Sequence, residues 1–215
     1  MPTFTQILDD TFARADTTPA PGRNSTAGVG NGWIDLQGST YCLNAAAGGL
    51  MRQRPGPKSP TGVDCPLYQG ATAALVSGRV RLYRSSPATA SRGAVFRASD
   101  KAEHVNGYFL GFNTQDNSVQ IVKSLDGFQT VLLDERLRNV MVPAAMVIVA
   151  TCWQQEPGRT LLSVGLYDPA NMAAPFTERR VLDEEKLLQG AAGIMGVSSG
   201  GTAFDAARVQ LYTAA

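Results

Sequence analysis

The sequence predicts an all-β protein in which antiparallel strands form a sandwich or a barrel. From about Thr72 onward, short runs of β-branched, aromatic and aliphatic residues alternate with clusters of Gly, Asn, Asp or Pro. Helical segments do not alternate with these runs, as a parallel βαβ arrangement would require. Segments such as Arg79 to Leu82 and Arg208 to Leu211 alternate polar and apolar residues. This period of two predicts sheets with one buried and one exposed face.

Turn-forming residues separate several of the predicted strands. Gln115-Asp116-Asn117 and Asp126-Gly127 stand where antiparallel neighbours would be joined. The strands expected in this part of the chain are Ala73 to Arg84, Ala94 to Ala98, Tyr108 to Asn113, Ser118 to Ser124, Thr130 to Asp134, Met146 to Trp153, Leu161 to Tyr167, Gly193 to Val197 and Ala206 to Tyr212.

The N-terminal third is richer in Pro and Gly, and its predicted strands are shorter. They are Gln6 to Phe12, Trp33 to Leu36 and Tyr41 to Asn44. Arg52 to Pro66 is expected to be an irregular loop within a single domain of residues 1–215. One short surface helix is predicted at Asp183 to Gln189, because acidic residues occupy its first turn and a glycine follows.

Several segments carry a family resemblance that covers nearly the whole chain. They are residues 10–16 with Gly32-Trp33, residues 93–100, 106–112 and 193–197, and Phe204-Asp205 with Val209-Gln210-Leu211. Together they resemble concanavalin-A-like, LamG-like jelly rolls. The resemblance implies a two-sheet antiparallel sandwich whose first and last strands pair, which would bring Asp10 near Asp205. Family roles range from sugar binding and adhesion to glycoside hydrolysis and virion decoration, so the fold alone narrows the function little.

The charge of the chain is nearly balanced. Nineteen Lys and Arg residues stand against eighteen Asp and Glu residues, for a formal net charge of +1. Binding to nucleic acid or to anionic lipid needs an excess of cationic side chains. We therefore expect neither nucleic-acid nor membrane partners. The longest apolar run, Val140 to Ala150, is interrupted by Pro143 and is too short to span a bilayer.

The cysteines and the single histidine argue against common metal and disulfide chemistry. Cys42, Cys65 and Cys152 are odd in number and lack C-x-x-C spacing, so we expect free thiols. His104 lies in a polar hairpin, and without a second histidine a transition-metal site is disfavoured. Calcium needs only carboxylate and carbonyl oxygens. We therefore expect no cofactor except calcium, with Asp10 and Asp205 as its candidate ligands.

No constellation of catalytic residues stands out, so we expect no enzyme. Gly196 to Gly200 fits G-x-S-x-G, but that motif requires a histidine further along the chain, and His104 precedes it. Glycoside hydrolases of the family carry two carboxylates that alternate along one strand. The pair Asp134-Glu135 is consecutive, and consecutive residues of a strand point to opposite faces. Two carboxylates from different strands could still come together, so a glycoside hydrolase stays open as the least favoured alternative.

Sugar binding would use exposed aromatic side chains, whose rings stack on the C–H surface of a pyranose. The candidates are Tyr108, Trp153 and Tyr83, drawn from a wider set that includes Tyr68 and Tyr167. Trp153 ends an apolar strand before Gln154-Gln155-Glu156, so both a core position and a binding platform stay open for it. Core positions are expected for Trp33, Phe96, Phe109 and Phe112.

Two functions follow from these features. The first is a non-enzymatic structural protein, a bacteriophage virion component such as a capsid decoration or tail-associated protein, with other virion proteins or its own copies as partners. A near-neutral domain with an N-terminus unlike an export signal and a Pro-rich loop suited to docking favours this role and a location in the virion. The alternative is a carbohydrate-binding module with glycans as its partners.

Overall fold

The strand bounds and contacts below come from a computed structural model of the chain. It describes residues 2–11, 33–35, 39–45, 48–54, 63–64, 66–68, 77–84, 90–101, 104–138, 140, 142–143, 145–184, 190–198, 205–206 and 208–214.

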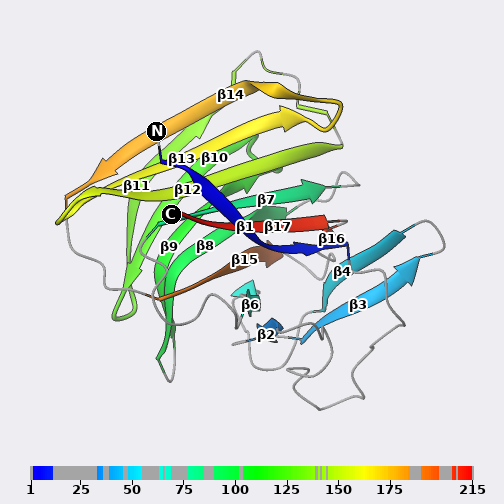
Figure 1. The fold of residues 1–215 in the computed structure, drawn as a ribbon, viewed down its shortest axis with the longest axis horizontal. Coiled ribbons are helices and arrows are strands. Elements are labelled where there is room, and N and C mark those ends of the chain that lie inside the picture. The colour runs from blue at the N-terminus through cyan, green and yellow to red at the C-terminus, as the bar shows by residue number, and fades with distance from the viewer. Residues whose placement is uncertain are drawn as a thin grey trace.

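Two antiparallel sheets pack face to face and form a jelly-roll sandwich (Figure 1). The six-stranded sheet has the order β1 (Phe4–Asp10), β17 (Arg208–Ala214), β7 (Gly78–Arg84), β12 (Met146–Glu156), β13 (Arg159–Asp168) and β14 (Asn171–Asp183). The eight-stranded sheet has the order β11 (Phe128–Arg136), β10 (Ser118–Leu125), β9 (His104–Asn113), β8 (Ala90–Lys101), β15 (Ala191–Ser198), β6 (Pro66–Tyr68) and β2 (Trp33–Asp35), with β5 (Val63–Asp64) also paired to β15. The predicted all-β sandwich is confirmed.

A small third sheet lies beside the sandwich (Figure 1). It has three strands in the order β16 (Asp205–Ala206), β4 (Gly48–Arg54) and β3 (Ser39–Ala45). In this sheet Asp205 pairs with Arg52 of β4.

The first and last strands of the sandwich are neighbours, as the family resemblance implied. β1 runs antiparallel to β17, with Phe4 opposite Ala214 and Asp10 opposite Val209. Figure 1 shows the two chain ends close to each other at this edge. Strands from opposite ends of the sequence therefore form one edge of the six-stranded sheet.

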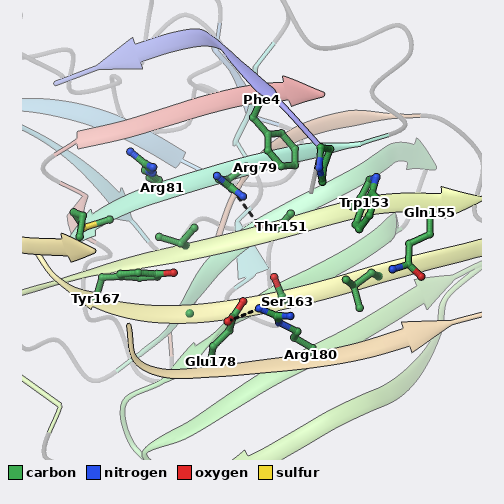
Figure 2. Close-up of a pocket in the computed structure, with 15 residues that line it drawn as sticks. Phe4, Arg79, Arg81, Thr151, Trp153, Gln155, Ser163, Tyr167, Glu178 and Arg180 are labelled. Carbon is green, nitrogen blue, oxygen red and sulfur yellow. Dashed lines mark hydrogen bonds and ion pairs between the residues drawn. The ribbon is translucent and has the colours of Figure 1, made fainter. Parts of the chain in front are cut away.

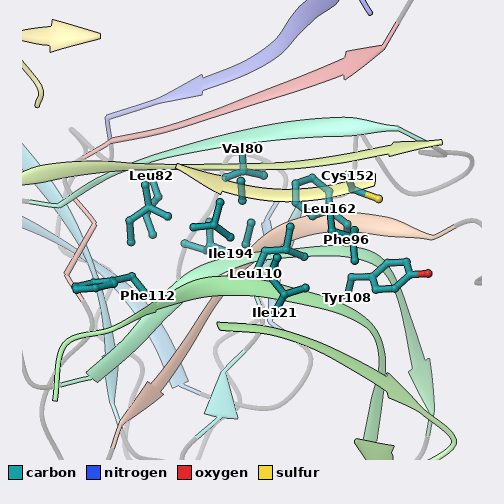
Figure 3. Close-up of a cluster of buried hydrophobic side chains, with 14 of the residues drawn as sticks. Val80, Leu82, Phe96, Tyr108, Leu110, Phe112, Ile121, Cys152, Leu162 and Ile194 are labelled. Carbon is teal, nitrogen blue, oxygen red and sulfur yellow. The ribbon is translucent and has the colours of Figure 1, made fainter. Parts of the chain in front are cut away.

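Alternation along each strand places one row of side chains between the sheets. In β7, Val80 and Leu82 are fully buried, whereas Arg79, Arg81 and Tyr83 are only partly covered. The buried rows of both sheets meet in one apolar core, part of which is shown in Figure 3. It includes Val80, Leu82, Phe96, Tyr108, Leu110, Phe112, Ile121, Ile148, Leu162 and Ile194.

The eight-stranded sheet is also buried on its other face. A second apolar cluster there comprises Val95, Ala98, Phe109, Ala191 and Met195, each at most 9% exposed. The core positions expected for Phe96, Phe109 and Phe112 are therefore confirmed. Trp33 forms part of β2, but its side chain lies outside the described set. On the six-stranded sheet, by contrast, outward residues such as Arg79, Arg81 and Trp153 are only partly covered.

The two turn predictions are confirmed. Asp126 and Gly127 join β10 to β11 with φ values of 50° and 83°. Positive φ at both positions is what the type I′ turn of a two-residue hairpin requires. The side chain of Asn106 holds this turn, because it accepts from the Asp126 amide at 2.8 Å and donates to the Asp126 carboxylate at 3.3 Å. Residues 114–117 form the turn between β9 and β10.

Three details differ from the sequence predictions. Asp183, the expected start of a helix, is the last residue of β14; Glu184 has no regular structure, and residues 185–189 lie outside the described ones. β14 itself was not predicted. The expected loop from Arg52 begins within β4 and includes β5, while residues 55–62 are not described.

No helix in the described ranges is long and apolar enough to cross a membrane.

Candidate functional site

The outer face of the six-stranded sheet holds a depression of about 490 Å³ (Figure 2). Side chains from β1, β7, β12, β13 and β14 line it, so it spans nearly the whole width of the sheet. The strand alternation that buries Val80 and Leu82 turns Arg79 and Arg81 to this face. In the same way, burial of Cys152 on β12 turns Thr151 and Trp153 outward.

Three aromatic rings contribute to the depression: Phe4 from β1, Trp153 from β12 and Tyr167 from β13. Tyr167 lies against Gly165, where an added Cβ would stand 2.7 Å from Cε2 of the Tyr167 ring. The missing side chain at Gly165 therefore provides the space that the Tyr167 ring occupies. Trp153 is partly exposed and is available as a platform.

Polar groups occupy the floor and the sides of the depression. Arg79 donates from Nε to the Thr151 hydroxyl at 3.3 Å and lies over the Phe4 ring at 4.3 Å from its centroid. On the opposite side, Arg180 and Glu178 of β14 form an ion pair at 2.8 Å. Ser163 and Gln155 add a hydroxyl and an amide. Aromatic surface beside hydroxyl, amide and charged groups is the composition that sugar sites use.

The surroundings shift the pKa values of Arg79 and Arg180, which lie on opposite sides of the depression. Partial burial, followed by repulsion from Arg81, holds the pKa of Arg79 below its usual range. The hydrogen bond to Glu178 raises the pKa of Arg180. Both guanidinium groups remain charged at neutral pH, because arginine is not deprotonated in proteins.

Tyr83 lies on the same outer face but forms a separate polar group with β17. Its hydroxyl donates to Oε1 of Gln210 at 3.2 Å, and the Tyr212 hydroxyl donates to the same atom at 3.0 Å. Arg208 covers the Tyr83 ring at 5.3 Å from its centroid. The structure therefore brings Trp153, but not Tyr83, to the depression.

Tyr108 is placed in the core, so the expectation of an exposed ring is wrong for this residue. Its side chain is 0% exposed, and its hydroxyl donates to Oδ2 of Asp183 at 2.5 Å. Burial and the adjacent carboxylate raise the pKa of Tyr108. In β9 it shares a face with Leu110 and Phe112, both core residues, so a sugar cannot reach it.

The structure describes the calcium candidates only in part. Asp10 is only 3% exposed and stands opposite Val209, while the side chain of Asp205 lies outside the described residues. Among the side chains that the structure describes, no group of three or more His, Cys, Asp or Glu could hold a metal. The neighbouring carboxylate of Asp9 is engaged by Arg208 and Gln210 instead.

The Asp9–Arg208 pair joins the first and last strands and should give a small pH-dependent stabilisation. The hydrogen bond from Arg208, ahead of that from Gln210, keeps the pKa of Asp9 below its usual range. A depressed carboxyl pKa stabilises the fold above about pH 4, where the unfolded group is ionised, and this is lost as pH falls through the folded pKa.

Arg208→Gln should therefore lower the free energy of unfolding by about 0.2 to 1 kcal/mol at pH 6, since both partners are partly exposed. The difference from the unmodified chain should shrink towards zero at about pH 2. Denaturant unfolding at both pH values measures it. A difference of equal size at both pH values would mean that the contact of Arg208 with Tyr83, rather than the ion pair, is responsible.

A buried polar group of Lys123, Asp183 and Tyr108 lies between the sheets. Lys123 and Asp183 form an ion pair at 3.1 Å with side chains 5% and 7% exposed, and Tyr108 completes the group. Cys152 is buried close by, and burial raises the pKa of its thiol to about 12. A thiol with that pKa is almost entirely protonated and unreactive at neutral pH. These residues belong to the core.

Sequence reasoning missed most of the depression. Phe4, Arg79, Arg81, Glu178 and Arg180 were not singled out as binding residues. The alternation around Arg79 and Arg81 showed that they face outward, but not that strands from distant parts of the chain flank them. The spacing of Gly165 and Tyr167 was a further sign, because a glycine two residues before an aromatic leaves room on the same face.

Comparison with known proteins supports the fold. No protein-family model matches the sequence, and no curated protein matches it. Among solved structures, the carbohydrate-binding module CBM66 from Bacillus subtilis is similar with a TM-score of 0.51 and 16% identity, over 81% of this chain and 91% of that chain. The exoplasmic/lumenal domain of VIP36, solved bound to Ca²⁺ and Man, has a TM-score of 0.56 and 11% identity, over 88% and 86% of the two chains. At these identities the similarity concerns the fold, which is consistent with the concanavalin-A-like jelly roll.

Proposed function

We propose that this chain is a non-catalytic carbohydrate-binding domain whose ligand lies in the depression on the outer face of the six-stranded sheet. The observation that carries the proposal is the placement of Trp153 and Tyr167 beside hydroxyl, amide and guanidinium groups in one hollow of about 490 Å³. Rings stack on the apolar side of a sugar, while the polar groups bind its hydroxyls. The solved relatives in fold include proteins described as carbohydrate-binding or mannose-bound, which adds support.

The absence of catalysis is part of the proposal. Glycoside hydrolysis uses two carboxylates on either side of the scissile bond. Among the described lining residues, Glu178 is the single carboxylate, and it is held by Arg180. We therefore expect that incubation with a bound glycan releases no reducing ends. Measurable release would contradict the non-catalytic role.

The binding proposal is tested by removing the platform. Trp153→Ala should weaken binding to whichever glycan scores on an array by about fivefold, because a stacked ring contributes about 1 kcal/mol. Isothermal titration calorimetry measures the affinity, and thermal unfolding shows whether the variant stays folded.

Phe128→Ala is the matched control. Phe128 is an aromatic residue 80% exposed at the β10–β11 hairpin, on the other sheet, so its loss should leave glycan affinity unchanged. Equal loss of affinity in both variants would contradict the proposed site. No binding to any glycan on a broad array would contradict the proposed function.

The virion role expected from the sequence stays a prediction, which particle fractionation of the native source would test.

A further inference from the structure

The described lining of the depression carries more positive than negative charge. Arg79, Arg81 and Arg180 face one acid, Glu178. Because Arg180 and Glu178 neutralise each other at 2.8 Å, the excess resides on Arg79 and Arg81. The whole chain has a net charge of only +1, so this excess is local to the site.

Arg79 and Arg81 are adjacent outward positions on β7, and neither forms an ion pair with an acidic side chain that the structure describes. Arg79 contacts the Thr151 hydroxyl and the Phe4 ring, and Arg81 lies over the Tyr212 ring at 5.1 Å from its centroid. Nε of Arg81 is buried and makes no hydrogen bond.

Two partly buried guanidinium groups of like charge repel each other. Burial, followed by repulsion from Arg81, keeps the pKa of Arg79 below its usual range. An anion bound beside them would relieve this repulsion. Guanidinium groups bind carboxylate and sulfate oxygens with paired, charge-assisted hydrogen bonds.

We infer that the ligand is an acidic glycan, whose carboxylate or sulfate group binds Arg79 and Arg81 while its sugar rings contact Trp153 and Tyr167. This inference rests on the proposed function and specifies the ligand class. Figure 2 shows the arrangement: the two arginines lie on one side, the Glu178–Arg180 pair lies on the opposite side, and Thr151 and Ser163 lie between them. The sheet order places β12 and β13 between β7 and β14, in agreement with this view.

A glycan with spaced charges fits this site better than a nucleic acid. Nucleic acids present one phosphate per nucleotide and need an extended row of cations. Here the excess positive charge is confined to two arginines on β7, because Arg180 across the sheet is paired with Glu178. Hydroxyl-rich segments of a sugar chain can hydrogen-bond to that neutral pair.

The test uses ligands that differ only in charge. Oligogalacturonate is compared with its methyl ester, and a sulfated galactan oligosaccharide with its desulfated form, by isothermal titration calorimetry against the full chain. At least one acidic member should bind about tenfold or more tightly than its neutral counterpart. Its affinity should also fall as NaCl is raised, because partly exposed charges are screened.

The variant Arg79→Gln/Arg81→Gln should remove this preference, because the affinity for the acidic member should fall by far more than the affinity for the neutral member. Arg79→Lys/Arg81→Lys, which keeps both charges, should retain part of it. The matched control Arg136→Gln/Arg138→Gln removes two exposed positive charges beside the eight-stranded sheet and should change nothing. Thermal unfolding establishes that each variant is folded.

The outcomes separate this inference from the function on which it rests. If the unmodified chain bound the acidic and neutral members equally, and Trp153→Ala abolished that binding, the acidic ligand would be overturned and the carbohydrate-binding function retained. No binding to any glycan would overturn both. Equal or tighter binding to single-stranded DNA of matched charge would overturn the glycan as the source of the anion.

Discussion

Replacing Asp183 by alanine is expected to lower the free energy of unfolding by about 3 to 5 kcal/mol, the usual loss when one partner of a buried ion pair is removed. Asp183 ends β14 of the six-stranded sheet, whereas Lys123 and Tyr108 belong to β10 and β9 of the other sheet. Its carboxylate accepts from Lys123 Nζ at 3.1 Å and from the Tyr108 hydroxyl at 2.5 Å. Alanine would leave the Lys123 ammonium group without its carboxylate in a site 5% exposed.

A double variant distinguishes loss of the charge pair from loss of packing. Lys123→Met/Asp183→Asn removes both charges and keeps an acceptor for Tyr108, so its loss should be clearly smaller than that of Asp183→Ala. Urea unfolding followed by tryptophan fluorescence gives both values. If Asp183→Ala lost less than about 1 kcal/mol, the pair would be accessible to water and the sheets would not be joined there.

Phe96→Ala is expected to have a loss of similar size, about 3 to 5 kcal/mol, because it leaves a cavity in the middle of the core. Phe96 is 0% exposed in β8, lies opposite Tyr108 of β9 and shares the core with Ala94. The alternation of Ala94 and Phe96 already predicted a common inward face.

The same denaturant experiment on Phe128→Ala provides the comparison. That residue is 80% exposed, and surface replacements of this kind change stability by about 0.5 kcal/mol or less. A loss below about 1 kcal/mol for Phe96→Ala would show that β8 presents its other row of side chains to the core.

Local sequence patterns determined much of the fold. β9, β10, β12 and β13 were all predicted within a few residues of their ends, since each is a β-rich run bounded by turn residues. The hairpin at Asp126-Gly127 was predictable because a tight turn with positive φ at both positions favours these residue types. Pairing of β1 with β17 followed from the family resemblance, since no local pattern reports a contact across the whole chain.

β14 shows where local patterns fail. Its sequence, Asn171–Asp183, contains Pro175 and a run of charged residues, which are features that argue against a central strand. It is an edge strand, where proline is tolerated, and only two of its side chains, Thr177 and Asp183, are buried. Its pairing with β13 makes it a strand, and this tertiary contact also brings Glu178 and Arg180 to the depression.

The sequence by itself determined that the chain is an antiparallel sandwich with outward arginines on β7 and apolar rows between its sheets. Only the tertiary structure decided which aromatic residues are accessible. Both faces of β9 are apolar, so alternation could not tell whether Tyr108 or Phe109 faced solvent, and both prove to be buried. Trp153 faces outward because the other sheet covers the opposite side of β12. Alternation assigns residues to two faces, and packing between distant strands determines which face water reaches.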